Sequence, residues 1–193
     1  MIGKQAKVLS GREITQVLSQ VKLSRYPERN EVMVLLSLKA GLRAKEISLI
    51  TWSMVTDASG EIGEVLHLPH QSTKGKSGRI IPLNKELKRA LTTLYELVSP
   101  EPHHHVITSE RGERMLPCNI SHWFKNVFKT LRLEGCSSHS GRRTFITNAA
   151  RHIIEVGGSL RDVQQLAGHT SLQMTQRYIE GNTEAKRKVV DLI

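Results

Sequence analysis

A set of basic and phenolic side chains in the last third of the chain has the composition of a phosphoryl-transfer site. The stretch SSHSGRRTF places His139 and Arg142 about one helical turn apart, and LAGHTSLQMTQRYI then brings His169 and, nine positions later, Tyr178. Core packing alone does not require this combination. Because two basic groups can hold a phosphodiester while a phenol attacks it, the stretch predicts that Tyr178 is a nucleophile.

Such a reaction needs positively charged groups beside the phosphate oxygens, on which negative charge builds up in the transition state. Arginine suits this task, because its planar fork binds phosphate oxygens in pairs and keeps its charge at working pH. We expect Arg43 and Arg142 to be the two arginine clamps that bind the phosphate. The phenol of Tyr178 has an ordinary pKa of about 10, so it needs positive surroundings or a base, and His139 can serve as that base.

The 5′ oxygen that leaves a nucleotide also needs a proton. We expect Lys74, on a predicted hairpin, to act as the general acid, with Lys76 as the alternative. Three further basic residues near these motifs, Lys76, Arg79 and Arg143, are expected to contact DNA phosphates.

Composition points to the same kind of partner. The 193 residues carry 28 Lys and Arg against 18 Asp and Glu, a formal charge of +10 with a pI near 9.9, which favours a polyanion such as nucleic acid. No apolar run approaches the roughly 18 residues of a membrane span, and the first residues lack the apolar stretch of a secretory signal. The two cysteines, Cys118 and Cys136, do not suggest a disulfide framework, so a cytoplasmic location is expected.

The elements that must position these residues are mainly helical, with a small antiparallel β-sheet at one edge, an α+β fold. The extended stretches EVLHLP and RIIPL flank QSTKGKSG, which has the composition of a hairpin tip. Helical spacing and capping residues predict helices over 10–21, 27–40, 85–98, 117–131 and 140–156, a short helix opened by RAKEISLITW, and further helices after Ser159, after His169 and from Thr183.

The chain is expected to form one domain. Residues 1–9 are interpreted as a basic, poorly ordered lead-in, residues 10–180 as the catalytic domain, and residues 181–193 as a tail that includes a short helix. The histidine run 103–105 sits in a Pro-flanked loop that is predicted to carry at most one short strand. It lacks the i,i+4 spacing and the extra ligand of a catalytic zinc site, so no metal site is predicted there.

The motifs, in this order, resemble those of the tyrosine recombinases of the phage integrase family, from about Val8 to the C-terminus. GLRAKEI is similar to the segment that carries the family's first arginine, which implies that role for Arg43 and a supporting role for Glu46. STKGKSGRIIPL is similar to the family's hairpin, in which the lysine ahead of the first glycine is catalytic, and this points to Lys74.

The remaining motifs fall in the last third. HSGRRTF resembles the family's H-x-x-R box at His139 and Arg142, and LAGHTSLQMTQRY resembles the segment with its second histidine, here His169, and its nucleophile, here Tyr178. Each motif alone is a weak signal, and their common order is specific. Taken singly, the residues also have structural explanations: Arg43 could be a surface arginine and Tyr178 a core residue.

The resemblance implies a site-specific DNA recombinase, an enzyme that cleaves and rejoins double-stranded DNA through a 3′-phosphotyrosyl link without metal or nucleotide cofactor. It also implies four protomers on two paired DNA sites that exchange C-terminal segments, with a monomer in isolation, and this gives the tail after Glu180 a role in assembly. Most of the family carry an additional N-terminal helical domain. This chain is therefore expected to be a fragment of a longer integrase or a short member similar in size to the invertases that switch fimbrial genes.

Two other functions stay open from the sequence. One is a DNA-binding accessory or regulatory protein that keeps the fold and does no chemistry. The other is a relaxing topoisomerase of type IB, which would use the same chemistry and rejoin the original strands.

Overall fold

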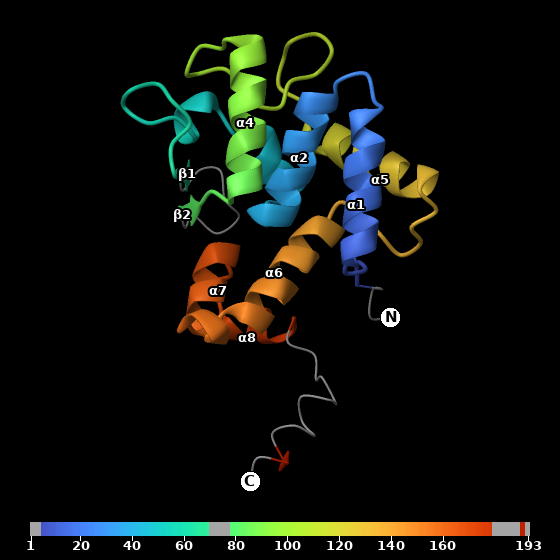
Figure 1. The fold of residues 1–193 in the computed structure, drawn as a ribbon, viewed down its shortest axis with the longest axis vertical. Helices are drawn as coiled ribbons and strands as arrows, with labels where there is room; N and C mark the ends of the chain where they lie inside the picture. Colours follow the sequence, from blue (N-terminus) through green and yellow to red (C-terminus); the bar gives the residue numbers. More distant parts are fainter. Residues whose placement is uncertain (1–4, 70–77, 179–189, 192–193) are drawn as a thin grey trace.

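The computed structural model describes residues 5–69, 78–178 and 190–191, and within them the chain is mainly helical with one two-stranded sheet at its edge. This confirms the predicted fold class (Figure 1). The elements in chain order are α1 (Gly11–Lys22), α2 (Pro27–Lys39), α3 (Ala44–Leu49), the 3₁₀ turn η1 (Trp52–Met54), β1 (Val65–Leu68), β2 (Arg79–Pro82), α4 (Lys85–Val98), α5 (Pro117–Thr130), α6 (Ser140–His152), the 3₁₀ turn η3 (Ile154–Val156), α7 (Leu160–Ala167) and α8 (Leu172–Gln176).

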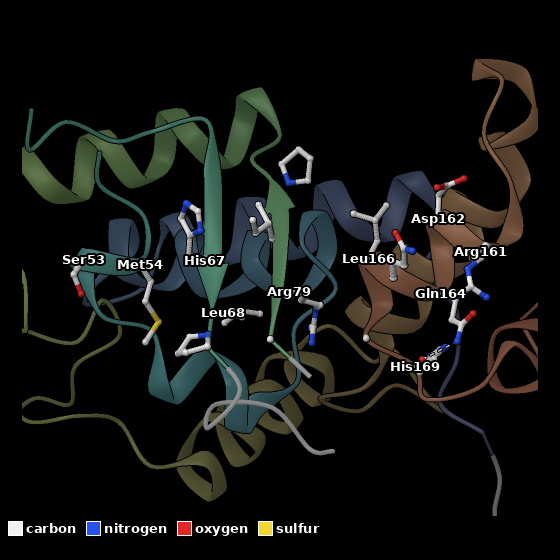
Figure 2. A pocket seen from close by; sticks show the side chains of 16 residues that line it. Ser53, Met54, His67, Leu68, Arg79, Arg161, Asp162, Gln164, Leu166 and His169 are labelled. Atoms are coloured by element: carbon white, nitrogen blue, oxygen red, sulfur yellow. Dashed lines mark hydrogen bonds between the residues drawn. The ribbon is translucent and has the colours of Figure 1, made fainter. Parts of the chain in front are cut away.

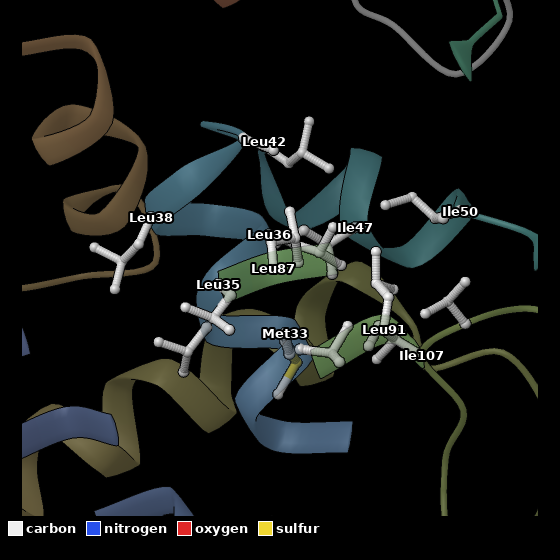
Figure 3. Close-up of a cluster of buried hydrophobic side chains, with 14 of the residues drawn as sticks. Met33, Leu35, Leu36, Leu38, Leu42, Ile47, Ile50, Leu87, Leu91 and Ile107 are labelled. Atoms are coloured by element: carbon white, nitrogen blue, oxygen red, sulfur yellow. The ribbon is translucent and has the colours of Figure 1, made fainter. Parts of the chain in front are cut away.

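Helix α2 is the centre of the hydrophobic core. Its residues from Val32 to Leu36 are almost completely buried, and it packs against α1, α4 and α6. Figure 3 shows its side chains meeting those of α3 and α4, with Leu36 and Met33 close to Leu87 and Leu91. Since residues 32–36 of α2 are apolar and buried on every side of the helix, this part of α2 can support helices on several sides, which is typical of a buried central helix.

The small sheet is an antiparallel hairpin. Val65 pairs with Pro82 and Leu68 with Arg79, while Leu66 and Ile81 are buried beneath it. The predicted extended stretches are thus confirmed as strands. The hairpin tip with Lys74 and Lys76 lies in residues 70–77, outside the described part of the chain.

The lead-in differs from the expectation over residues 5–9. Leu9 is buried, and its backbone N–H donates to Thr144 Oγ1 of α6 at 2.8 Å, while the Lys7 N–H donates to the Gly135 carbonyl at 2.9 Å. These long-range bonds fix the segment on the domain before the Ser10–Glu13 capping box starts α1. A basic composition alone did not reveal these partners.

One predicted continuous element was wrong in detail. The helix predicted over 140–156 ends at His152, and the chain continues through η3 to Gly157, whose positive φ of 77° closes this turn. Near the histidine run no full strand forms within the described residues: Thr51 and His105 make an isolated antiparallel bridge. The helices α6, α7 and α8 lie together at one end of the molecule, next to the sheet edge (Figure 1).

None of the described helices has both the length and the apolar character needed to cross a membrane.

Helix α6 approaches α2 closely because it has a glycine at the contact. A Cβ built on Gly141 would lie 2.3 Å from Ser37 Oγ and 3.3 Å from the Ser37 carbonyl carbon. We expect Gly141→Ala to lower the free energy of unfolding by about 1–3 kcal/mol, the usual cost of overpacking, when measured by urea denaturation.

Gly11→Ala is the matched control, since Gly11 also lies in a helix and an added Cβ there meets nothing within 4 Å. The prediction fails if the two substitutions change stability by the same amount.

Candidate active site

A pocket of about 440 Å³ collects five of the six residues that the sequence predicted to be catalytic. Its walls include Arg43, His139, Arg142, His169 and Tyr178. They come from the junction of α2 and α3, the start of α6, and the segment from the end of α7 to the end of α8. Further lining residues are Gln5, Ala6, Ser137, Arg143, Met174 and Arg177. Among the described residues, no Asp or Glu lines this pocket, so its field favours an anion.

Arg43 is held at the start of α3 by a buried carboxylate. The Glu46 side chain, 2% exposed, accepts the Arg43 backbone N–H at 2.8 Å and its Nη1 at 3.1 Å. Burial by itself raises the pKa of Glu46, but the hydrogen bonds and charges of Arg79 and Arg43 outweigh it and hold that pKa below its ordinary value. Glu46 is therefore ionised at neutral pH and orients Arg43 toward the pocket.

Arg142 is fixed by backbone carbonyls from both sides of the pocket. Its Nη1 donates to the Gly41 carbonyl at 2.6 Å and its Nη2 to the Ala167 carbonyl at 2.7 Å, while the residue is 4% exposed. Burial, and then the charge of Arg43, lowers its pKa to about 10. Arg142 thus stays charged at neutral pH and joins the α2–α3 junction to the end of α7.

His139 lies at the N-cap of α6, one turn before Arg142, as the spacing predicted. It is exposed at the mouth of the pocket. Desolvation, and then the charges of Arg142 and Arg43, lowers the pKa of its imidazole below the ordinary value. His139 is therefore neutral at pH 7 and can accept a proton.

His169 is largely buried in the wall of the pocket, in the turn between α7 and α8. Its Nδ1 lies 2.9 Å from Oγ1 of Thr175, which is itself fully buried. Burial, and then the nearby charge of Arg142, lowers its pKa to about 4. A neutral ring whose Nδ1 accepts from the Thr175 hydroxyl carries its proton on Nε2, and such a ring can donate a hydrogen bond to an anion.

Tyr178 follows α8 and is partly buried. Its ring stacks on the His169 imidazole with centroids 5.5 Å apart, and the Arg143 guanidinium lies over it at 5.8 Å. The ring also packs against the small apolar cluster that includes Ile146 and Val163. The ring of Tyr178 is therefore part of the packing and also lines the basic pocket, and its role as nucleophile stays a prediction.

The other basic residues are placed differently from one another. Lys74 and Lys76 lie outside the described residues. Arg143 lines the pocket and donates to the Gln5 side chain. The expected phosphate contact of Arg79 does not fit its burial, because its side chain is 7% exposed and pairs with Glu46 behind the pocket.

Sequence reasoning missed several parts of this site. Thr175, which holds His169, and Arg177, which lines the pocket, sit in the motif LQMTQRY and could have been noted from their types. The carbonyls of Gly41 and Ala167 that anchor Arg142 leave no trace in the sequence, since every residue has a carbonyl.

The histidine run lies elsewhere. His103 and His104 are exposed in a loop and contact each other, and His105 is half-buried. Among the described residues, no group of three or more His, Cys, Asp or Glu side chains is arranged to hold a metal ion.

Fold and pocket together define the class: a mainly helical domain with one pocket lined by arginines, two histidines and a tyrosine. The chain belongs to the phage integrase family, which it matches over residues 7–185. This membership confirms the resemblance that the motifs indicated.

Two curated relatives illustrate the likeness. The chain is 29% identical over 180 residues to tyrosine recombinase XerC of Rhizobium meliloti (strain 1021). This match covers 89% of this chain and 53% of the relative. It is 27% identical over 184 residues to tyrosine recombinase XerA of Thermococcus kodakarensis, covering 94% of this chain and 61% of the relative. The chain thus spans little more than half the length of these relatives.

Solved structures share the fold. The crystal structure of XerA recombinase superimposes with a TM-score of 0.75 at 24% identity, covering 96% of this chain and 64% of that one. A λ integrase dimer bound to a COC′ core site gives a TM-score of 0.70 at 21% identity, covering 91% of this chain and 49% of that one.

Proposed function

We propose that this chain is the catalytic domain of a site-specific DNA recombinase, which cleaves and rejoins double-stranded DNA through a phosphotyrosine intermediate at Tyr178. The observation that carries the proposal is that Arg43, Arg142, His139 and His169 line one pocket together with Tyr178. Membership of the phage integrase family and the DNA-bound state of the λ integrase relative support DNA as the substrate.

In the proposed step the Tyr178 oxygen attacks the scissile phosphorus, and the bond from phosphorus to the 5′ oxygen breaks. His139 takes the phenol proton, and the two arginine clamps neutralise the charge that builds up on the phosphate oxygens. His169 donates from Nε2 to one of these oxygens. The leaving 5′ oxygen takes a proton from Lys74, with Lys76 as the alternative, and attack by a 5′ hydroxyl reverses the step.

The proposal includes an oligomeric assembly on DNA. Four protomers on two paired DNA sites would allow strands to be exchanged rather than resealed, and residues 181–193 would pass between neighbours. The +10 charge of the chain supports a complex with DNA, since protomers of like charge repel one another until phosphates neutralise them.

Covalent trapping tests the proposal. The protein is incubated with nicked suicide duplexes taken from the DNA that flanks its own gene, then denatured and examined for a band shifted by attached DNA. A shifted band supports the recombinase. Binding of the same duplexes without a band favours the non-catalytic accessory protein, and relaxation of a supercoiled circle without exchange between two sites favours the topoisomerase.

The contact between His169 and Thr175 gives a further prediction. Thr175→Val keeps the shape of the side chain but removes the hydroxyl that lies 2.9 Å from His169 Nδ1, so the imidazole loses the hydrogen bond that orients it in the pocket. We expect the rate of covalent attachment to fall roughly 10-fold, the effect of one buried hydrogen bond.

Thr175→Ser, which retains the hydroxyl, is the control for this pair. Equal rates for the Val and Ser variants would show that the hydroxyl of Thr175 has no part in the reaction.

A further inference from the structure

Arg79 connects three parts of the molecule without lining the tyrosine pocket. It is the first residue of β2, directly after the hairpin tip, and its side chain is 7% exposed. Its Nη1 donates to Glu46 Oε1 at 2.9 Å, and the same oxygen accepts Nη1 of Arg43 at 3.1 Å. Glu46 is therefore a buried carboxylate shared by one arginine of the pocket and one arginine outside it.

The guanidinium of Arg79 also supports the turn that carries His169. A Cβ built on Gly168 would lie 2.5 Å from Arg79 Nη1 and 3.1 Å from its Cζ, so the two residues are packed with no room for a side chain. Gly168 has a φ of +61° and ends α7 directly before His169. Arg79 and His169 both lie on the walls of a second cavity of about 1170 Å³, between the sheet and α7 (Figure 2).

Stability alone does not account for this arginine. Its Nε and Nη2 are buried and have no hydrogen-bond partner among the described residues, and each unpaired buried donor carries a desolvation cost. A buried ion pair is also weak evidence of stabilisation, because an apolar side chain of similar size is often as stable. An apolar residue could fill the same space, but it could not place a positive charge next to the Glu46 carboxylate.

We propose that Arg79 is a positioning residue of the cleavage reaction. It holds Glu46 so that Glu46 orients Arg43, and it sets the turn with His169 at a fixed distance from that pair. The inference rests on the proposed function, because its main consequence is a change in the rate of cleavage. Arg79 contacts no substrate in this arrangement and acts through Glu46 and the α7–α8 turn.

The charges around Arg79 predict a particular pH dependence. The groups that face it are Glu46 and Arg43 from the start of α3, Arg142 from α6 and His169 from the α7–α8 turn. Without Arg79, burial still raises the pKa of Glu46, while one of the two positive partners that lower it is lost. In the variant, Glu46 would then take up a proton at a higher pH than in the wild type, and the protonated carboxyl would release Arg43. As the solution is acidified, the variant should therefore lose activity at a higher pH than the wild type.

The experiment compares Arg79→Met with Arg79→Lys by the rate of covalent attachment to the suicide duplexes, measured from pH 5 to pH 8. We expect the Met variant to react roughly 10- to 100-fold more slowly, as for a misplaced catalytic group, with its acid limb moved to higher pH. The Lys variant, which restores a positive charge next to Glu46, should recover most of the rate and the original acid limb. Arg161→Met removes an exposed arginine from the wall of the same cavity and should leave the acid limb in place.

Glu46→Gln in the Arg79→Met background completes the design. If Arg79 acts through Glu46, the double variant should lose the shifted acid limb, because no carboxyl remains to take up the proton. A Met variant with the wild-type rate and pH profile overturns the inference, and so does a Lys variant as slow and as shifted as the Met variant. Absence of attachment in the wild type would instead contradict the proposed function, so the two failures are distinguishable.

Discussion

Tyr178→Phe is expected to abolish covalent attachment to DNA while leaving DNA binding nearly unchanged. The substitution removes only the hydroxyl that would form the bond to phosphorus. The ring remains and keeps its stacking on His169 and its packing beside Ile146 and Val163. The measurement is the shifted band of the trapping assay, run in parallel with a binding assay on the same duplexes.

Stability provides the control for this variant. Because the phenylalanine ring preserves the buried contacts of Tyr178, the thermal midpoint should change by no more than a few degrees, about 1 kcal/mol for a domain of this size. A band of undiminished intensity in the Phe variant would remove Tyr178 from the role of nucleophile, whatever the binding assay shows.

Arg142→Ala is expected to lower the rate of attachment by at least about 100-fold, as loss of a single donor to a developing oxyanion does. The same change leaves the carbonyls of Gly41 and Ala167 without their donor in a buried place. We therefore also expect a loss of roughly 2–6 kcal/mol in the free energy of unfolding, since each of the two unpaired buried groups costs about 1–3 kcal/mol.

Arg43→Ala separates the two effects. Arg43 is more exposed, and Glu46 keeps Arg79 as a partner when Arg43 is removed, so this variant should lose a similar factor in rate with a smaller loss of stability. The rates are measured by trapping at a temperature where all variants are folded, and stability by urea denaturation. Rates within a factor of about three of the wild type would remove both arginines from the role of phosphate clamps, because an oxyanion donor contributes far more.

Much of the local structure could be predicted from the sequence because its causes are local. The Ser10–Glu13 box starts α1, and the Ser159–Asp162 box starts α7. The spacing of His139 and Arg142 fixes them one turn apart wherever the helix lies. The helix boundary at His152 was missed because nothing in the spacing of apolar residues marks the turn into η3, where Ile154 and Val156 are exposed.

Within the site, residue types and order indicated which side chains take part. Arginine and histidine at these positions, followed by a tyrosine, carry their chemistry with them, so Arg43, Arg142, His169 and Tyr178 were expected in one pocket before any fold was known. The supporting contacts were not, because they join residues far apart in the chain. The pairing of Glu46 with Arg79 spans 33 positions, and that of Arg142 with Gly41 spans 101.

By itself, the sequence determined the helical class, the basic charge and the main arginines and histidines that line the pocket with the tyrosine, because these follow from side-chain chemistry and local spacing. Only the tertiary structure decided that Arg79 is buried behind the pocket instead of facing DNA, that Thr175 holds His169, and that Leu9 is buried and bonded to α6. Burial and long-range hydrogen bonds depend on which surfaces come into contact when the chain folds, and the types of the residues involved do not specify these contacts.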